Sequence, residues 1–116
     1  MDSDDFGLWC EEEAARYLET VRGWQVLARR VHFREGELDL VCREPDGSLV
    51  FVEVKGVRNE TFGAVVERLT TQKIRRWKKA VLQWRLRHEA WGPARLLFVG
   101  VELQKGQSHL VEEWVE

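Results

Sequence analysis

The sequence predicts one mixed α/β domain whose elements follow the order α-β-β-β-α-β-β. Two segments, 3–23 and 64–88, carry apolar residues at helical spacing, and five others carry the β-branched and aromatic residues typical of strands. Turns rich in Gly and Pro separate these segments. The chain has 116 residues, 44% of them hydrophobic, which suffices for one real core and leaves no room for a second. We therefore expect residues 1–116 to form a single domain.

The first predicted element is a helix that begins near residues 3–5. Ser3 and Asp5 can cap the free N–H groups at a helix start, and acidic side chains suit the positive end of the helix dipole. Apolar residues then recur at helical spacing through Val21, and Gly23 is a natural stop.

Three strands are predicted next, at 24–33, 36–44 and 48–56. All three are rich in valine, leucine or phenylalanine. The segment 45–47 between the second and third strands contains Pro and Gly in the places that a tight turn favours. These two strands should therefore pair as an antiparallel hairpin.

A long amphipathic helix is predicted from 64 to 88. One of its sides is mostly apolar and comprises Ile74, Trp77, Val81, Trp84 and His88. The opposite side is basic and comprises Arg68, Arg75 and Lys79. Gly92 and Pro93 break the helix. Two further strands follow, at 95–103 and 109–116.

Composition excludes several classes of protein. The net charge of -2 and the sequence pI near 6.0 argue against a general nucleic-acid coat, which would be strongly basic. Cys10 and Cys42 lie far apart without a C-x-x-C motif, so we expect buried thiols rather than a disulfide framework or a zinc cluster. No run approaches the length of a membrane span, and the N-terminus is acidic where an export signal would be basic, so we expect a cytoplasmic protein without membrane contact.

Charge is nevertheless concentrated on particular elements. Seven of the 20 acidic residues lie in the first 20 positions, whereas residues 68–88 hold eight of the 18 Lys and Arg and no acid. The cations of this run would attract a phosphate backbone: Arg68, Arg75, Arg76, Lys78 and Lys79. A solvated helix face is the ordinary alternative, but the lack of compensating acids favours nucleic acid.

Acidic residues interrupt two of the apolar strands. Residues two apart share a face of a strand, so Glu37 and Asp39 point one way while Leu38 and Leu40 point the other. The same rule places Glu53 and Lys55 together. Phe51 shares their side, and Val50, Val52 and Val54 face the core on the other. Because an unpaired buried carboxylate is costly, this pattern needs an explanation.

A shared metal ion is one explanation. Asp39 and Glu53 lie on neighbouring strands across a short turn, so their carboxylate oxygens are placed to bind one hard cation, for which Mg²⁺ or Mn²⁺ is better suited than zinc. Such an ion lowers the pKa of a bound water, and Lys55 is placed to position that water or help deprotonate it. The alternative is that Glu53 and Lys55 neutralise each other on a solvated sheet face, since E-x-K alone is common. The accompanying G-E-x-D motif and the flanking acidic and basic helices favour the metal site.

Successive motifs along the chain resemble those of the YraN-like family of small bacterial proteins. They are G-x-x-x-E-x-x-A at Gly7, Glu11 and Ala14, GELDLV at 36–41, FVEVK at 51–55, then Arg58, Phe62-Gly63 and Lys73. The family resembles archaeal Holliday-junction resolvases and other PD-(D/E)XK nucleases, whose core order is α-β-β-β-α-β. The resemblance therefore implies a restriction-endonuclease-like fold.

The resemblance also implies roles for individual residues. Asp39 and Glu53 would be the metal-binding acids and Lys55 the catalytic lysine. Glu11 would bind or orient the metal, and the Val54 carbonyl would be a further ligand. The alternative for Glu11 is an acid on the helix surface.

One position departs from the family pattern. The family commonly has Arg-Phe-Asp on its fourth core strand, whereas this chain has Arg95-Leu96-Leu97, so any role of that aspartate is absent.

Several further residues are candidates for contacts with nucleic acid. Lys73 lies on the otherwise apolar side of its helix, where it either reaches a phosphate near the acids or extends its amine to water. Arg58 follows Lys55 and is placed to touch a phosphate. Trp24, Trp77 and Trp84 are expected in the core. Three other tryptophans would serve either an oligomer interface, such as a homodimer, or base stacking: Trp9, Trp91 and Trp114.

The leading hypothesis from sequence is a Mg²⁺- or Mn²⁺-dependent endonuclease that hydrolyses DNA, including branched DNA by analogy with the resolvases. A second hypothesis is a non-catalytic nucleic-acid-binding or accessory domain on the same fold. A third is an adaptor that binds protein through an exposed apolar strand or Trp patch. Because fold does not determine chemistry, metal binding and DNA binding discriminate among the three.

Overall fold

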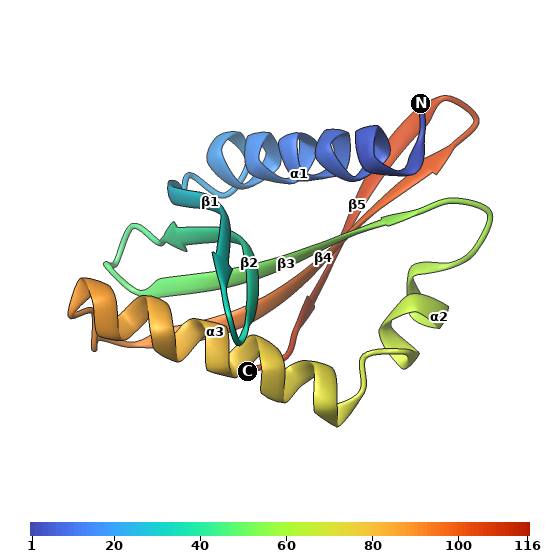
Figure 1. Cartoon of the computed structure of the whole chain (residues 1–116). Helices are drawn as coiled ribbons and strands as arrows, with labels where there is room; N and C mark the ends of the chain where they lie inside the picture. Colours follow the sequence, from blue (N-terminus) through green and yellow to red (C-terminus); the bar gives the residue numbers. More distant parts are fainter.

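A five-stranded mixed sheet with helices on both faces forms the protein, as the computed structural model of residues 1–116 shows (Figure 1). The elements are α1 (Ser3–Thr20), β1 (Gln25–Phe33), β2 (Gly36–Arg43), β3 (Leu49–Val57), α2 (Phe62–Glu67), α3 (Thr71–His88), β4 (Ala94–Gln104) and β5 (Gln107–Trp114). The strands lie in the order β1-β2-β3-β4-β5. The predicted mixed α/β fold is confirmed. None of the helices has the length and apolar character needed to cross a membrane.

Pairing in the sheet is antiparallel except between β3 and β4. Leu49–Val57 of β3 runs parallel to Ala94–Glu102 of β4, so the two strands are joined by a crossover that contains α2 and α3. The pairs β1–β2, β2–β3 and β4–β5 are antiparallel neighbours in sequence. The predicted antiparallel hairpin of the second and third strands is therefore confirmed.

Two apolar cores lie on the two faces of the sheet. On one face α1 packs over alternate residues of the central strands, with Val50 and Val52 fully buried. On the other face Phe51 packs edge-on against Trp84 of α3. Strand alternation in β3 is thus as predicted. Both cysteines are fully buried free thiols, also as predicted.

The predicted single helix from 64 to 88 is wrong, because the structure has two helices there. The hydroxyl of Thr61 caps α2 by accepting a hydrogen bond from the Ala64 N–H at 3.2 Å. The hydroxyl of Thr70 caps α3 in the same way through the Lys73 N–H, also at 3.2 Å. A cap at Thr70 satisfies the free N–H groups of a new helix and so ends the preceding one. The apolar spacing continues across the break, which is why periodicity alone predicts one helix.

The expectation that Leu38 and Leu40 share one face is also wrong. Both are fully buried, but Leu40 belongs to the core under α1 and Leu38 to the core under α3. The β2–β3 pairing ends at Leu40, and beyond it the β1–β2 hairpin bends toward α3 (Figure 1). Gly36 at the hairpin tip allows close packing there, since a Cβ on it would lie 3.1 Å from the Arg76 carbonyl oxygen.

A second glycine fixes the position of α2. A Cβ on Gly100 of β4 would lie 2.0 Å from a ring carbon of Phe62, so the Phe62 side chain occupies the space over the strand that any other residue would fill. Phe62 also packs on Phe98, with ring centroids 5.4 Å apart. The first residue of α2 is thus held against β4.

Candidate functional site

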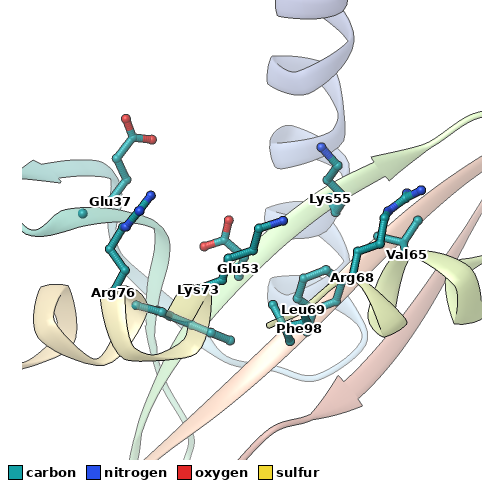
Figure 2. Close-up of a pocket in the computed structure, with 11 residues that line it drawn as sticks. Glu37, Glu53, Lys55, Val65, Arg68, Leu69, Lys73, Arg76 and Phe98 are labelled. Carbon is teal, nitrogen blue, oxygen red and sulfur yellow. The ribbon is translucent and has the colours of Figure 1, made fainter. Parts of the chain in front are cut away.

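A pocket of about 490 Å³ lies between β3–β4 and the helices α2 and α3. Glu53 and Lys55 enter it from β3, because alternation along that strand turns both toward the α3 face. Glu37 of β2 also lines it, with its carboxylate directed away from Glu53 and toward His32 at 3.0 Å (Figure 2). The predicted grouping of Glu53 with Lys55 therefore places both in the wall of a pocket.

Asp39 is fixed beside this pocket by the backbone of the neighbouring strand. It lies one residue beyond the last paired residue of β2, where the ladder with β3 has ended. Its Oδ2 accepts a hydrogen bond of 2.7 Å from the Val54 N–H, which the departing strand would otherwise leave without a partner. Because the β2–β3 ladder ends before Asp39, the Asp39 carboxylate takes the place of a backbone acceptor for the Val54 N–H. This hydrogen bond holds the carboxylate next to Glu53.

The two carboxyl groups of Asp39 and Glu53 perturb each other strongly. The pKa of Glu53 is raised to about 9, first by burial and then by the negative charge of Asp39 and a hydrogen bond to it. The pKa of Asp39 is raised as well by burial, although the hydrogen bonds from Val54 and Glu53 act to lower it. Like charges in such contact do not both ionise, so at neutral pH the pair shares one proton.

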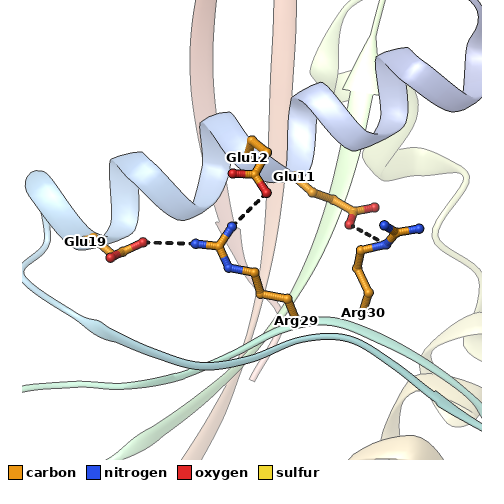
Figure 3. A network of polar contacts seen from close by, with 5 residues as sticks. All are labelled: Glu11, Glu12, Glu19, Arg29 and Arg30. Carbon is orange, nitrogen blue, oxygen red and sulfur yellow. Dashed lines mark hydrogen bonds and ion pairs between the residues drawn. The ribbon is translucent and has the colours of Figure 1, made fainter.

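Glu11 approaches the same pair from α1, on the other face of the sheet. Its pKa is raised by burial and by the negative charge of Asp39. Its Oε1 is buried without a hydrogen-bond partner, and the nearest cation is the Arg30 Nε at 3.6 Å (Figure 3). The predicted helix glutamate is thus close enough to interact with the strand acids, and it is oriented to Arg30.

The backbone of Arg30 explains how that pair forms. Neighbouring residues of a strand normally point to opposite faces. Arg30, however, has a φ of 53°, in the left-handed region, and both it and Arg29 reach α1. The Arg29 guanidinium binds Glu12 at 2.8 Å and Glu19 at 3.3 Å (Figure 3). Two successive arginines therefore tie β1 to the acidic helix, and one of them faces Glu11.

The oxygen donors fit a hard divalent cation. Asp39, Glu53 and Glu11 are carboxylates, the ligand type that Mg²⁺ and Mn²⁺ prefer. Their mutual repulsion and the unpartnered Glu11 oxygen are both features that a positive charge would relieve. With the side chains as they stand, no group of three acidic, histidine or cysteine residues is arranged to hold one ion. Val54 lies next to these acids, because its N–H donates a hydrogen bond to Asp39. A role for the Val54 carbonyl as a metal ligand stays a prediction.

Four cations surround the acids at the pocket. Lys55, Arg68, Lys73 and Arg76 all line it (Figure 2). Of these, Lys55, Arg68 and Lys73 are individually predicted from the sequence, whereas Arg76 is predicted only as part of the basic run. A helical spacing of three from Lys73 is the signal that relates Arg76 to the same side of α3.

The remaining predicted cations lie elsewhere. Arg75 and Lys79 are exposed on α3 and do not line the pocket. The Arg58 guanidinium lies 3.8 Å from the ring centroid of Phe6, so it stacks on α1 rather than entering the pocket. Contacts of these three with nucleic acid stay predictions.

Leu97 is part of the core and lies away from the site. It pairs with Val52, is fully buried and packs in the cluster under α1. The neighbouring Phe98 faces the pocket, opposite Glu53 in the β3–β4 register. An aspartate at position 97 would therefore point into the α1-side core, so Leu97 removes no pocket residue.

Comparisons with known proteins agree on the family. A UPF0102 protein from Syntrophomonas wolfei is 50% identical over 78 residues, which cover 67% of this chain and 66% of that protein. One from Burkholderia lata is 42% identical over 100 residues, covering 86% of this chain and 70% of that protein. The chain thus spans just under two thirds of the first relative.

Two solved structures are similar at lower levels. A repair endonuclease from Pyrococcus abyssi is 22% identical with a TM-score of 0.47, covering 91% of this chain and 41% of that one. An EndoMS complex with double-stranded DNA is 21% identical with a TM-score of 0.47, covering 82% of this chain and 36% of that one.

The family model named "Uncharacterised protein family UPF0102" matches residues 10–109. This match spans most of the chain and contains every acid of the candidate site. The resemblance to the YraN-like family, predicted from the motifs, is confirmed. The chain belongs to the protein family UPF0102.

Proposed function

We propose that this protein is a Mg²⁺- or Mn²⁺-dependent nuclease that hydrolyses phosphodiester bonds in DNA, branched DNA included. The observation that carries the proposal is the coupled pair Asp39–Glu53 beside Lys55, in a pocket lined by cations. A pair of partly buried carboxyls with raised pKa values is costly for the fold, and perturbed acids in a cleft are typical of active sites.

Each residue of the pocket has a role in this proposal. Asp39, Glu53 and Glu11 would hold the divalent ion, which when bound would supply positive charge to the phosphate and lower the pKa of a water. The Val54 N–H keeps the Asp39 carboxylate in place, so this ligand is positioned before substrate arrives. Lys55 lines the pocket beside Glu53, where its amine would orient the water and assist removal of its proton. Lys73, Arg68 and Arg76 contact the phosphate backbone.

The test separates metal binding from cleavage. Calorimetric titration with Mg²⁺ and Mn²⁺ is carried out on the wild type and on Glu53→Gln, and the same samples are then assayed on linear, branched and single-stranded DNA at low salt. Glu113→Gln is the matched control, because Glu113 is exposed and lies in the same row of the sheet, two strands away through Phe98. We expect metal binding and cleavage in the wild type and the control, and neither in Glu53→Gln.

Two outcomes would contradict the proposal. Equal metal affinity in the wild type and Glu53→Gln would show that the pair does not hold the ion. Salt-sensitive DNA binding without cleavage by the wild type in either metal would instead identify a non-catalytic nucleic-acid-binding domain.

A further inference from the structure

The pocket at Glu53 is larger and more apolar than a metal ion and a phosphate require. Its volume of about 490 Å³ lies within the range of ~300–1,000 Å³ found for sites that enclose organic ligands. Four of its lining residues are apolar: Val65, Leu69, Trp77 and Phe98. A metal ion and a phosphate are bound by oxygen, nitrogen and cations, so neither explains this apolar wall.

Trp77 adds a second observation at the same wall. The residue is only 4% exposed, and its indole N–H has no hydrogen-bond partner. It is the one buried side-chain donor in the structure that lacks an acceptor. Unsatisfied buried donors are rare and call for an explanation, and an acceptor on a bound ligand would supply one if the Trp77 ring shifted toward the pocket as the ligand entered.

The positive charges that line the pocket indicate what kind of ligand would bind against this apolar wall. Lys55, Arg68, Lys73 and Arg76 line the pocket, and only Arg68 is engaged in an ion pair, with Glu60 at 2.8 Å. The fitting ligand is therefore flat and apolar on its faces, has acceptors at its edge and is joined to phosphates. A nucleotide has all of these properties.

We propose that the pocket receives the base of an unpaired nucleotide of DNA, next to the phosphate that would be cleaved beside Glu53. The placement of that phosphate rests on the proposed function. The base lies against the apolar wall formed with Trp77 and Phe98, while the flanking phosphates contact the cations.

A base inside an intact duplex cannot occupy this pocket. Both of its faces are covered by neighbouring bases and its edge is paired, so entry requires that it leave the stack at a cost. A nucleotide that is already unpaired, as in a bulge, a single strand or a junction, avoids most of that cost. The substrate class that follows is DNA with at least one unpaired nucleotide.

The experiment compares three duplexes of equal length in EDTA, so that neither metal nor cleavage affects the result. One is fully paired, one carries a single unpaired adenine, and one carries an unpaired abasic residue at the same position. The abasic duplex has the same backbone distortion without the base. Because stacking of one base on an aromatic side chain changes affinity by about tenfold or more, we expect the adenine bulge to bind about tenfold more tightly than the abasic bulge.

Two variants locate the effect. Leu69→Trp fills the pocket from its half-buried rim without altering an acid or a cation, and we expect the preference for adenine to disappear. Leu82→Trp is the matched control, since Leu82 is 47% exposed on α3 and does not line the pocket, and it should keep the preference. Trp77→Phe keeps an aromatic ring and removes the N–H, so it should weaken binding of the adenine bulge alone.

Equal binding of the adenine and abasic bulges by the wild type would overturn the proposal, whatever the variants do. A preference that persists in Leu69→Trp, or that Leu82→Trp abolishes as well, would also overturn it. If the preference is present but no DNA is cleaved with metal, the nuclease function fails and the base pocket stands. If DNA is cleaved with metal but the adenine bulge is not preferred, the base pocket fails and the nuclease function stands.

Discussion

Replacing Glu53 by glutamine should stabilise the protein at neutral and alkaline pH. Glutamine has nearly the same shape and can donate to Asp39 as the protonated glutamic acid does, but it never ionises. Because the pKa of Glu53 is about 9 in the folded protein and 4.5 is its ordinary value, the unfolded chain releases this proton at a lower pH than the folded protein. The folded state therefore loses stability relative to the variant as pH rises from 4.5 to 9.

The size of the effect follows from the interval between these pKa values. At pH 7 the solution is about 2.5 pH units above the pKa of Glu53 in the unfolded chain, whereas the folded protein still holds the proton. Each of these pH units lowers the free energy of unfolding by about 1.36 kcal/mol. The wild type should therefore be less stable than Glu53→Gln by about 3 kcal/mol at pH 7. The difference should shrink to about 1 kcal/mol at pH 5 and grow to about 5 kcal/mol at pH 8.5, before levelling off above pH 9.

Urea unfolding followed by tryptophan fluorescence at several pH values measures this difference directly. Glu113→Gln, an exposed glutamate on β5, should match the wild type throughout. Saturating Mg²⁺ should reduce the gap at pH 8, because a bound cation replaces the proton as the source of positive charge. Parallel stability curves for the wild type and Glu53→Gln across this pH range would refute the conclusion that the acid pair shares a proton.

Substitutions at three further positions test other parts of the structure by the same unfolding assay. Asp39→Ala leaves the Val54 N–H unpaired and should cost about 1–3 kcal/mol, whereas Asp39→Asn keeps an acceptor oxygen and should cost less; equal losses would argue against the role of that bond. Thr70→Ala removes the cap of α3 and should cost about 1 kcal/mol, with a matching drop in helical circular dichroism; no change would mean that the cap is dispensable. Leu97→Asp buries a carboxylate in the core under α1 and should cost more than about 4 kcal/mol or prevent folding, while a stable variant with gained activity would show that position 97 reaches the site.

The predictions from sequence were correct where the geometry of a single strand determines which way a side chain points. Alternation along β3 correctly placed Glu53 and Lys55 on the face opposite Val50 and Val52, because a buried strand holds this alternation throughout its length. The neighbouring position of Asp39 followed from the short turn between β2 and β3. These predictions needed only local geometry.

Predictions failed where tertiary packing overrides local pattern. Leu38 and Leu40 lie in different cores because the β1–β2 hairpin bends over α3, and the sequence gives no measure of that bend. The break between the two helices before Thr70 was not predicted, because the apolar spacing of α3 continues through it. The pocket wall to which Trp77 belongs depends on how α3 crosses the sheet, so Trp77 was predicted only as a core residue.

The single parallel pairing, between β3 and β4, also has a consequence for the order in which the protein folds. The meander β1–β2–β3 and the hairpin β4–β5 each form from neighbouring segments, whereas β3 can meet β4 only after the whole α2–α3 connection has been traversed, which is the slower, entropically costly event. Asp39 and Glu53 both belong to the early meander. Lys55 belongs to the meander too, whereas Arg68, Lys73 and Arg76 join only with the late step, so we expect the acids to come together before three of the four cations that line the pocket.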